Sequence, residues 1–211
     1  SRFLARREIG KGDVVCVSGS KGILNYAAII ACLKSGVIYC FFDPDSPSQR
    51  LERIFARCNP RVLLVDDSFK QNFPDLSVPS KPEIHFLESK LFALELTEFK
   101  RSNVGLNQAI TGSDPAYIMF TSGSTGFPKG VLITHDNLLN FIEWGADTFG
   151  FTEEDVFTGV NPLYFDNAVF DMYSSFFSGG RLISFSKDVV AQPKALIELI
   201  DEMKCTVWFS V

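Results

Sequence analysis

The chain has 211 residues, of which 46% are hydrophobic, 13% aromatic and 21% charged, a composition typical of globular proteins that excludes disordered and fibrous classes. At roughly 150 residues per domain, this length predicts one large domain or two small ones. The 20 basic and 25 acidic residues give a net charge of −5. Because the basic residues are also scattered, we expect no nucleic-acid partner.

The sequence predicts neither a membrane segment nor a metal site built from side chains. Its longest apolar stretches, residues 26–33 and 37–42, are far shorter than the about 18 residues that cross a bilayer. The five cysteines form no Cys-x-x-Cys pair, and His85 and His135 lie far apart. We therefore expect no membrane partner and no metal ligand, and we interpret the cysteines as reduced, mostly buried thiols of a cytoplasmic protein.

The first third of the chain alternates short apolar runs with helical patterns. The periodicity predicts strands at 14–18, 37–42 and 61–65, with helices at 22–34 and 48–58. Continuous apolar strands separated by helices of about ten residues are typical of β-α-β units. We therefore predict an α/β fold with mostly parallel sheets and helices on both faces.

The middle of the chain is less regular. Residues 67–113 contain three prolines, a short predicted strand at 84–87 and a polar stretch, and we expect a subdomain boundary near residues 97–113. The alternation then resumes. Strands are predicted at 116–120, 130–134, 156–158, 181–185 and 206–210, and helices at 136–149, 167–178 and 193–204.

Three further side chains have simple expectations. Trp144 and Trp208 are expected in the core, and Asp171 on a solvated or intersubdomain side of its helix.

Residues 1–8 read as the last turns of a helix, and Val211 lies within an apolar strand. We therefore expect the chain to be part of a longer protein.

The segment richest in chemical groups is TSGSTGFPKG, residues 121–130, between two predicted strands. Glycines let backbone N–H groups turn toward an anion, hydroxyls add donors and Lys129 adds a positive charge, which together suit a polyphosphate. The segment does not match the Walker pattern, and the chain contains no G-x-G-x-x-G. Composition alone leaves two interpretations open, a phosphate-binding loop and an ordinary Gly/Ser surface hairpin.

This string of ten resembles the phosphate-binding loop of the acyl-adenylate-forming superfamily, which includes nonribosomal peptide synthetase adenylation domains, acyl-CoA synthetases and luciferases. Residues 33–51 resemble the second core motif of that family, which is mostly structural. The resemblance implies ATP and Mg²⁺ as cofactors and Lys129 as a catalytic residue. It also implies a set of phosphate-binding residues: Thr121, Ser122, Gly123, Ser124, Thr125, Gly126, Lys129 and Gly130.

A third stretch, FDNAVFD at residues 165–171 followed by SGG at 178–180, resembles the fourth core motif of amino-acid-activating domains. That resemblance implies that Asp166 contacts the α-ammonium group of the substrate and that Asn167 and Phe170 line the side-chain pocket. From the residues alone, an Asp directly before a helix is first a candidate N-cap. Phe170 and Tyr173 follow on the same helix face and form a plausible aromatic wall.

The resemblance implies that the chain is a truncated N-terminal portion, residues 1–211, of an adenylation domain. The parent enzyme would form aminoacyl-AMP and pyrophosphate from an amino acid and ATP, and would then load the phosphopantetheine thiol of a carrier protein. Because the later motifs of the family are absent from these residues, we expect the chain alone to be inactive. Two alternatives remain: an acyl- or aryl-acid CoA ligase and a non-catalytic nucleotide-binding module.

Overall fold

The computed structural model describes residues 1–67, 69, 78–100, 102, 109–121 and 127–210. The chain divides into two compact units, Ser1–His135 and Asp136–Val211, which are described separately below. No helix within the described residues combines the length and the apolar character needed to cross a membrane.

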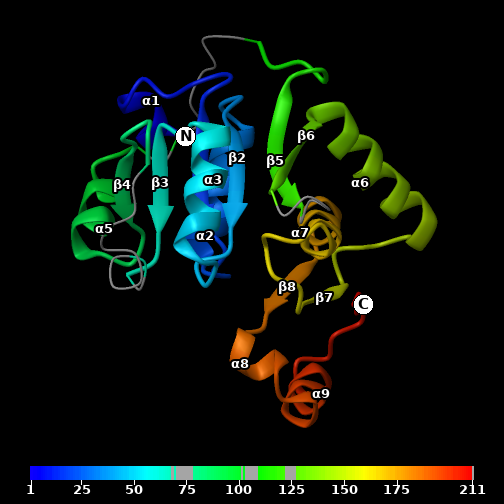
Figure 1. The fold of residues 1–211 in the computed structure, drawn as a ribbon. Helices are drawn as coiled ribbons and strands as arrows, with labels where there is room; N and C mark the ends of the chain where they lie inside the picture. Colours follow the sequence, from blue (N-terminus) through cyan, green and yellow to red (C-terminus); the bar gives the residue numbers. More distant parts are fainter. Residues whose placement is uncertain (68, 70–77, 101, 103–108, 122–126, 211) are drawn as a thin grey trace. The chain divides into compact units, whose positions relative to one another are not determined.

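The first unit is built on a six-stranded sheet with the strand order β4-β3-β1-β2-β5-β6 (Figure 1). The pairs β1–β2, β1–β3, β2–β5 and β3–β4 are parallel, and β5–β6 is antiparallel. This arrangement confirms the predicted mostly parallel sheet. The strands are β1 (Val14–Ser18), β2 (Ile38–Phe42), β3 (Val62–Val65), β4 (Glu83–Phe86), β5 (Pro115–Thr121) and β6 (Lys129–Thr134).

Helices cover both faces of this sheet, as predicted. In α3 (Ser48–Cys58), the residues Leu51, Ile54, Phe55 and Cys58 are buried, which is the spacing of one helix face. That face packs with Leu63 of β3 in one apolar cluster. Asn59 ends the helix in the left-handed conformation, with φ of 48°.

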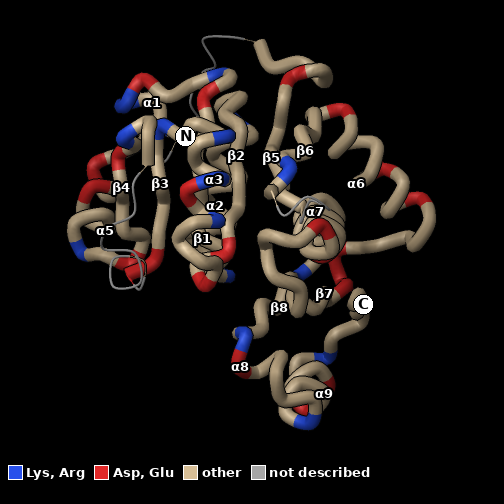
Figure 2. The backbone as a smooth tube through the Cα atoms, in the orientation of Figure 1, with Lys and Arg blue, Asp and Glu red and all other residues tan. Residues whose placement is uncertain are grey.

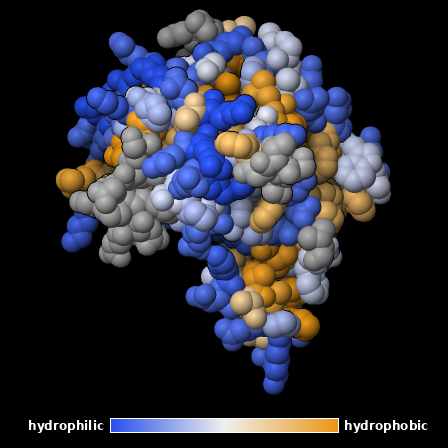
Figure 3. Space-filling view, in the orientation of Figure 1, coloured by the Kyte–Doolittle hydropathy of each residue, from blue (hydrophilic) through white to orange (hydrophobic). Residues whose placement is uncertain are grey.

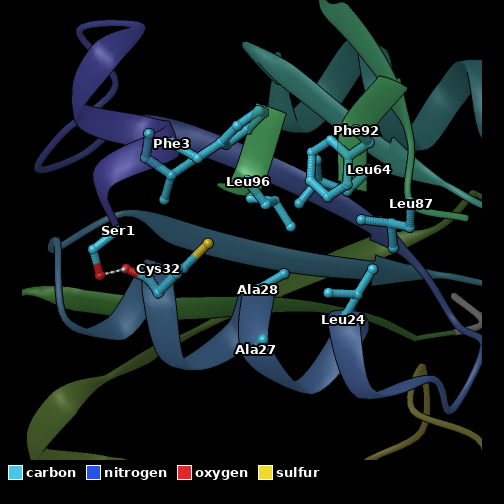
Figure 4. A pocket seen from close by; sticks show the side chains of 12 residues that line it. Ser1, Phe3, Leu24, Ala27, Ala28, Cys32, Leu64, Leu87, Phe92 and Leu96 are labelled. Atoms are coloured by element: carbon cyan, nitrogen blue, oxygen red, sulfur yellow. Dashed lines mark hydrogen bonds between the residues drawn. The ribbon is translucent and has the colours of Figure 1, made fainter. Parts of the chain in front are cut away.

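The opposite face of the sheet is covered by three helices, and a small cavity lies between them and β3. Leu64, whose side chain points away from that of Leu63, lines this cavity of about 140 Å³ together with Ala28 and Phe92 (Figure 4). Its lining is almost entirely apolar. The helices are α1 (Arg2–Arg6), α2 (Ile23–Leu33) and α5 (Lys90–Thr97).

The second unit contains the parallel pair β7 (Val156–Gly159) and β8 (Arg181–Ser184). Against this pair packs α7 (Asn167–Ser178), in which every residue from 168 to 175 is buried. Apolar side chains reach the surface near β8, whereas the surface over α3 is mainly hydrophilic (Figure 3). The remaining helices are α6 (His135–Phe149), α8 (Lys187–Val190) and α9 (Pro193–Glu202).

The structure corrects three of our expectations in the second unit. Residues 206–210 form no strand, because the described chain pairs there only through one isolated bridge, Phe157 to Val207. Trp144 and Trp208 are each 51% exposed rather than in the core. Asp171 is buried, at 2% exposure, where its carboxylate accepts a hydrogen bond from the Asn161 amide at 3.1 Å.

Candidate functional site

The segment 121–130 connects the two antiparallel strands β5 and β6. Thr121 is the last residue of β5 and lies opposite Lys129, the first residue of β6. The Thr121 hydroxyl also donates a hydrogen bond to the Lys129 carbonyl oxygen at 3.5 Å. The two ends of the segment are therefore held together as one cross-strand pair. Five of the predicted phosphate-binding residues lie outside the described residues: Ser122, Gly123, Ser124, Thr125 and Gly126.

The cross-strand pair places two of the candidate phosphate-binding residues side by side. Residues directly opposite each other in an antiparallel pair point to the same face of the sheet, so the Thr121 hydroxyl and the Lys129 ammonium lie on one face. Both residues are exposed. A hydroxyl donor and a mobile positive charge on one open face suit the oxygens of a phosphate chain.

The second half of the segment is anchored to α3. The guanidinium carbon of Arg53 lies 4.6 Å from the centroid of the Phe127 ring, within the range of a cation–π contact. Pro128, the next residue, is buried. Sequence reasoning did not find Arg53, because nothing in the spacing of α3 distinguishes it from the other arginines of that helix.

Gly130 has a packing role. It lies opposite Phe120 in the β5–β6 pair, and a Cβ atom placed on it would lie 3.2 Å from both Ile118 Cγ2 and Phe120 Cε1. An aromatic ring that covers a strand glycine in this way is a known device of β-sheet packing. The glycine therefore lets the Phe120 ring lie across β6.

Asp166 lies directly before α7, but it does not cap the helix. Its backbone is already helical, with φ of −60° and ψ of −30°, and its side chain makes no capping hydrogen bond. The turn begins earlier, because the backbone N–H of Ala168 donates to Phe165 and that of Val169 donates to Asp166. The N-cap interpretation is therefore wrong, and the carboxylate is left exposed.

Asn167 and Phe170 follow along the same helix in different surroundings. Asn167 is half-buried. Phe170 is 7% exposed, and its ring centroid lies 4.8 Å from that of Phe209 and 5.6 Å from that of Phe149. Within the described residues, Phe170 is thus part of an aromatic core.

The predicted residues fall into two groups, one in each unit. Thr121, Lys129 and Gly130 meet at the end of the β5–β6 pair in the first unit, and Asp166, Asn167 and Phe170 lie at the start of α7 in the second. Basic residues are interspersed with acidic ones along both units (Figure 2).

Comparison with known proteins matches residues 1–211 to the family model described as AMP-binding enzyme. Surfactin synthase subunit 3 of Bacillus subtilis (strain 168) is 30% identical over 210 residues, which cover 100% of this chain and 16% of that protein. A D-alanine–D-alanyl carrier protein ligase of Bacillus cereus (strain ATCC 10987 / NRS 248) is 32% identical over 188 residues, covering 89% of this chain and 35% of the ligase.

A solved structure shows the same fold. The nonribosomal peptide synthetase FmoA3, bound to alpha-methyl-L-serine-AMP, matches with a TM-score of 0.79 and 25% identity, covering 100% of this chain and 22% of that one. The chain therefore spans well under half the length of each of these three relatives.

Proposed function

The chain belongs to the AMP-binding enzyme family, and from this premise we propose that it is the N-terminal part of an adenylation domain that activates an amino acid with ATP. In the proposed reaction the amino-acid carboxylate attacks the α-phosphate of ATP, which forms aminoacyl-AMP and releases pyrophosphate. The acyl group then passes to the phosphopantetheine thiol of a carrier protein. The resemblance to a D-alanyl carrier protein ligase and to a synthetase that binds an amino-acid adenylate supports this assignment.

The amino-acid assignment rests on the Asp166 carboxylate, which is exposed and has no partner among the described residues. This carboxylate caps no helix and forms no hydrogen bond or ion pair with the residues that the structure describes. A carboxylate in this position is available to an ammonium group, and such a pair forms charge-assisted hydrogen bonds. An acyl- or aryl-acid CoA ligase needs no acidic group at this point, because its substrate carries no ammonium.

The proposed role of the 121–130 segment is to hold the triphosphate. The Thr121 hydroxyl and the Lys129 ammonium fit phosphate oxygens, since both are exposed and share one face of the hairpin. Lys129 would act as the catalytic residue by stabilising the negative charge of the leaving pyrophosphate. Mg²⁺, held by the phosphates, would supply further neutralisation of that charge. We assign Ser122, Gly123, Ser124, Thr125, Gly126 and Gly130 to the same loop.

On the second unit, we propose that Asn167 borders the substrate pocket and that Phe170 forms the aromatic base beneath it. Asn167 is half-buried next to Asp166, and Phe170 is fixed by its contacts with neighbouring rings. A rigid support would hold the acidic group in place. We also propose a cytoplasmic location, which the five free cysteines support.

The test is amino-acid-dependent ATP–pyrophosphate exchange on the whole protein that contains this chain. The panel comprises amino acids, their deaminated analogues, and fatty and aryl acids. We expect exchange with one or a few amino acids and none with the deaminated analogues. Exchange with non-amino acids alone would identify an acyl- or aryl-acid ligase, and no exchange with any acid would favour a non-catalytic nucleotide-binding module.

We further propose that residues 1–211 do not turn over by themselves. The relatives that the chain matches are far longer, since it covers 16% of the surfactin synthase subunit and 35% of the carrier protein ligase. The same exchange assay on the isolated chain is expected to give only background. Exchange at the rate of the whole protein would refute this proposal and leave the assignment of the reaction intact.

A further inference from the structure

Three buried cysteine thiols meet in the first unit, at Cys16, Cys40 and Cys58. Cys16 in β1 lies beside Cys40 in the parallel register of β2, so both side chains point to the same face of the sheet. Cys58, the last residue of α3, covers that face. The three Sγ atoms lie within 4.8 Å of one another.

Within this cluster, Cys16 and Cys58 are in direct contact. Their Sγ atoms are 3.5 Å apart and share a hydrogen bond. The thiol of Cys40 instead donates to the carbonyl oxygen of Phe41, at 3.7 Å. Cys16 and Cys58 are therefore already in contact, whereas the Cys40 thiol has a backbone partner.

The surroundings of the cluster favour an uncharged product. Its neighbours are apolar side chains such as Leu51, Phe55 and Leu63. Three thiolates around a monovalent or divalent cation would leave net negative charge among these groups, and burying unpaired charge is costly. A disulfide carries no charge, so the same core accommodates it.

We propose that Cys16 and Cys58 form an oxidation site, at which hydrogen peroxide converts the two thiols into a disulfide. The Cys58 thiolate attacks one peroxide oxygen, the O–O bond breaks, and the departing hydroxide takes up the thiol proton as water. The Cys16 sulfur then attacks the Cys58 sulfenic acid, the S–O bond breaks and a second water leaves. Both sulfurs are oxidised, and both peroxide oxygens are reduced to water.

Cys58 is the thiol that reacts first. It retains 6% exposure, whereas Cys16 and Cys40 retain none. A hydrogen bond from the Cys16 thiol lowers the pKa of Cys58, because it stabilises the Cys58 thiolate. Burial raises the pKa of Cys16, so Cys16 acts as the resolving partner.

A disulfide between Cys16 and Cys58 requires their two sulfur atoms to move closer together. A sulfur–sulfur bond is about 2.05 Å long, so side-chain rotation must bring the two Sγ atoms about 1.5 Å closer than they are now. The bond would tie the end of α3 to β1. The same helix carries Arg53, which contacts Phe127 of the 121–130 segment.

The experiment treats the purified protein with hydrogen peroxide, alkylates the remaining thiols in denaturant, and maps the tryptic peptides without reduction. Trypsin places the four relevant cysteines in separate peptides: residues 12–21 with Cys16, 22–34 with Cys32, 35–50 with Cys40 and 58–61 with Cys58. We expect a linked product of peptides 12–21 and 58–61 that reverts to the two free peptides on reduction. Its yield should exceed that of any pair containing Cys32 by at least about tenfold.

The matched control is Cys32, which is also buried at 0% exposure but lies outside the cluster. Cys32→Ser and Cys40→Ser should keep the linked product, and Cys16→Ser and Cys58→Ser should lose it. Peptide mapping of the unsubstituted protein is decisive by itself if a variant fails to fold. Full alkylation of Cys16 and Cys58 after peroxide, linkage at random among the cysteines, or a stoichiometric metal bound to the three thiols would each overturn the proposal.

Discussion

The ring of Phe120 lies across Gly130, its partner in the antiparallel β5–β6 pair, so closely that a Cβ atom on Gly130 would come within 3.2 Å of the ring. This contact lies one residue from the Thr121–Lys129 pair that closes the 121–130 segment. The strand ends that border the proposed phosphate loop thus include a glycine that leaves room for a neighbouring aromatic ring.

Gly130→Ala is therefore expected to destabilise the first unit. The added methyl group would lie 3.2 Å from both Ile118 Cγ2 and Phe120 Cε1, so those side chains must shift, and overpacking of this kind costs about 1 kcal/mol of unfolding free energy or more. Denaturant unfolding monitored by circular dichroism measures the loss. The control is Gly10→Ala, because a Cβ atom at Gly10 has no neighbour within 4 Å. Equal losses at the two glycines would contradict the packing role.

Arg53→Ala is expected to weaken ATP binding without unfolding the protein. The contact between Arg53 and the Phe127 ring holds the end of the 121–130 segment that leads into β6. Such a contact is worth about 0.5–1 kcal/mol at an exposed site. The KM for ATP in the exchange assay should rise about two- to fivefold. Arg57→Ala, four residues later on the same helix, should leave it unchanged. A similar rise in both variants would point to a general effect of charge.

The sequence predicted helices and strands well where apolar residues recur at a clear helical or strand spacing. α3 begins and ends where its pattern predicts, because Leu51, Ile54, Phe55 and Cys58 all belong to one buried face. α5 was not predicted, since prolines dominate the region before it, although Ser89 caps it by accepting from the Phe92 N–H. Residues 206–210 contain a run of apolar side chains, as a buried strand does. A strand also requires hydrogen bonds to a neighbouring strand, and the sequence pattern does not show whether such a neighbour exists.

The motif contains both Thr121 and Lys129, and the structure pairs them across β5 and β6; their binding of phosphate stays a prediction. The sequence could not identify Arg53, whose contact with Phe127 depends on how α3 packs. From the residues alone it also offered Asp166 as a helix cap, and it placed Asp171 on a solvated or intersubdomain side of its helix. The structure leaves Asp166 uncapped and buries Asp171 against Asn161, because Asn161 comes from a separate segment that helical periodicity does not reveal.

The pair of Lys11 and Asp114 predicts an acid-sensitive contribution to stability. The Lys11 ammonium, 2.7 Å away, and the N–H of Thr111 lower the pKa of the Asp114 carboxyl to about 2. Because the folded pKa lies below the unfolded value of about 3.9, this contribution is complete above pH 4 and is lost as the pH falls toward 2. Asp114→Asn should flatten the stability profile within that window. An unchanged slope between pH 4 and pH 2 would contradict the assignment.

Asp166→Asn is expected to abolish amino-acid activation while leaving the fold intact. The substitution keeps the shape of the side chain but removes the charge that would pair with the substrate ammonium, so kcat/KM should fall about 100-fold. The unfolding free energy should change by less than about 0.5 kcal/mol, because the carboxylate is exposed and caps no helix. Full activity in a stable variant would remove Asp166 from the site.

Asp171→Ala should lower the free energy of unfolding, unlike Asp166→Asn, so the two variants distinguish Asp171 within α7 from Asp166 directly before it. Asp171 is buried and accepts a hydrogen bond from Asn161 Nδ2, and that amide also donates to the Phe209 carbonyl oxygen at 2.9 Å. Removal of the carboxylate leaves a buried amide donor unsatisfied, which costs about 1–3 kcal/mol. Denaturant unfolding should show this loss, whereas Asp166→Asn should not. If Asp171→Ala were as stable as the unsubstituted protein, the buried pair would have no part in fixing the chain around Phe209.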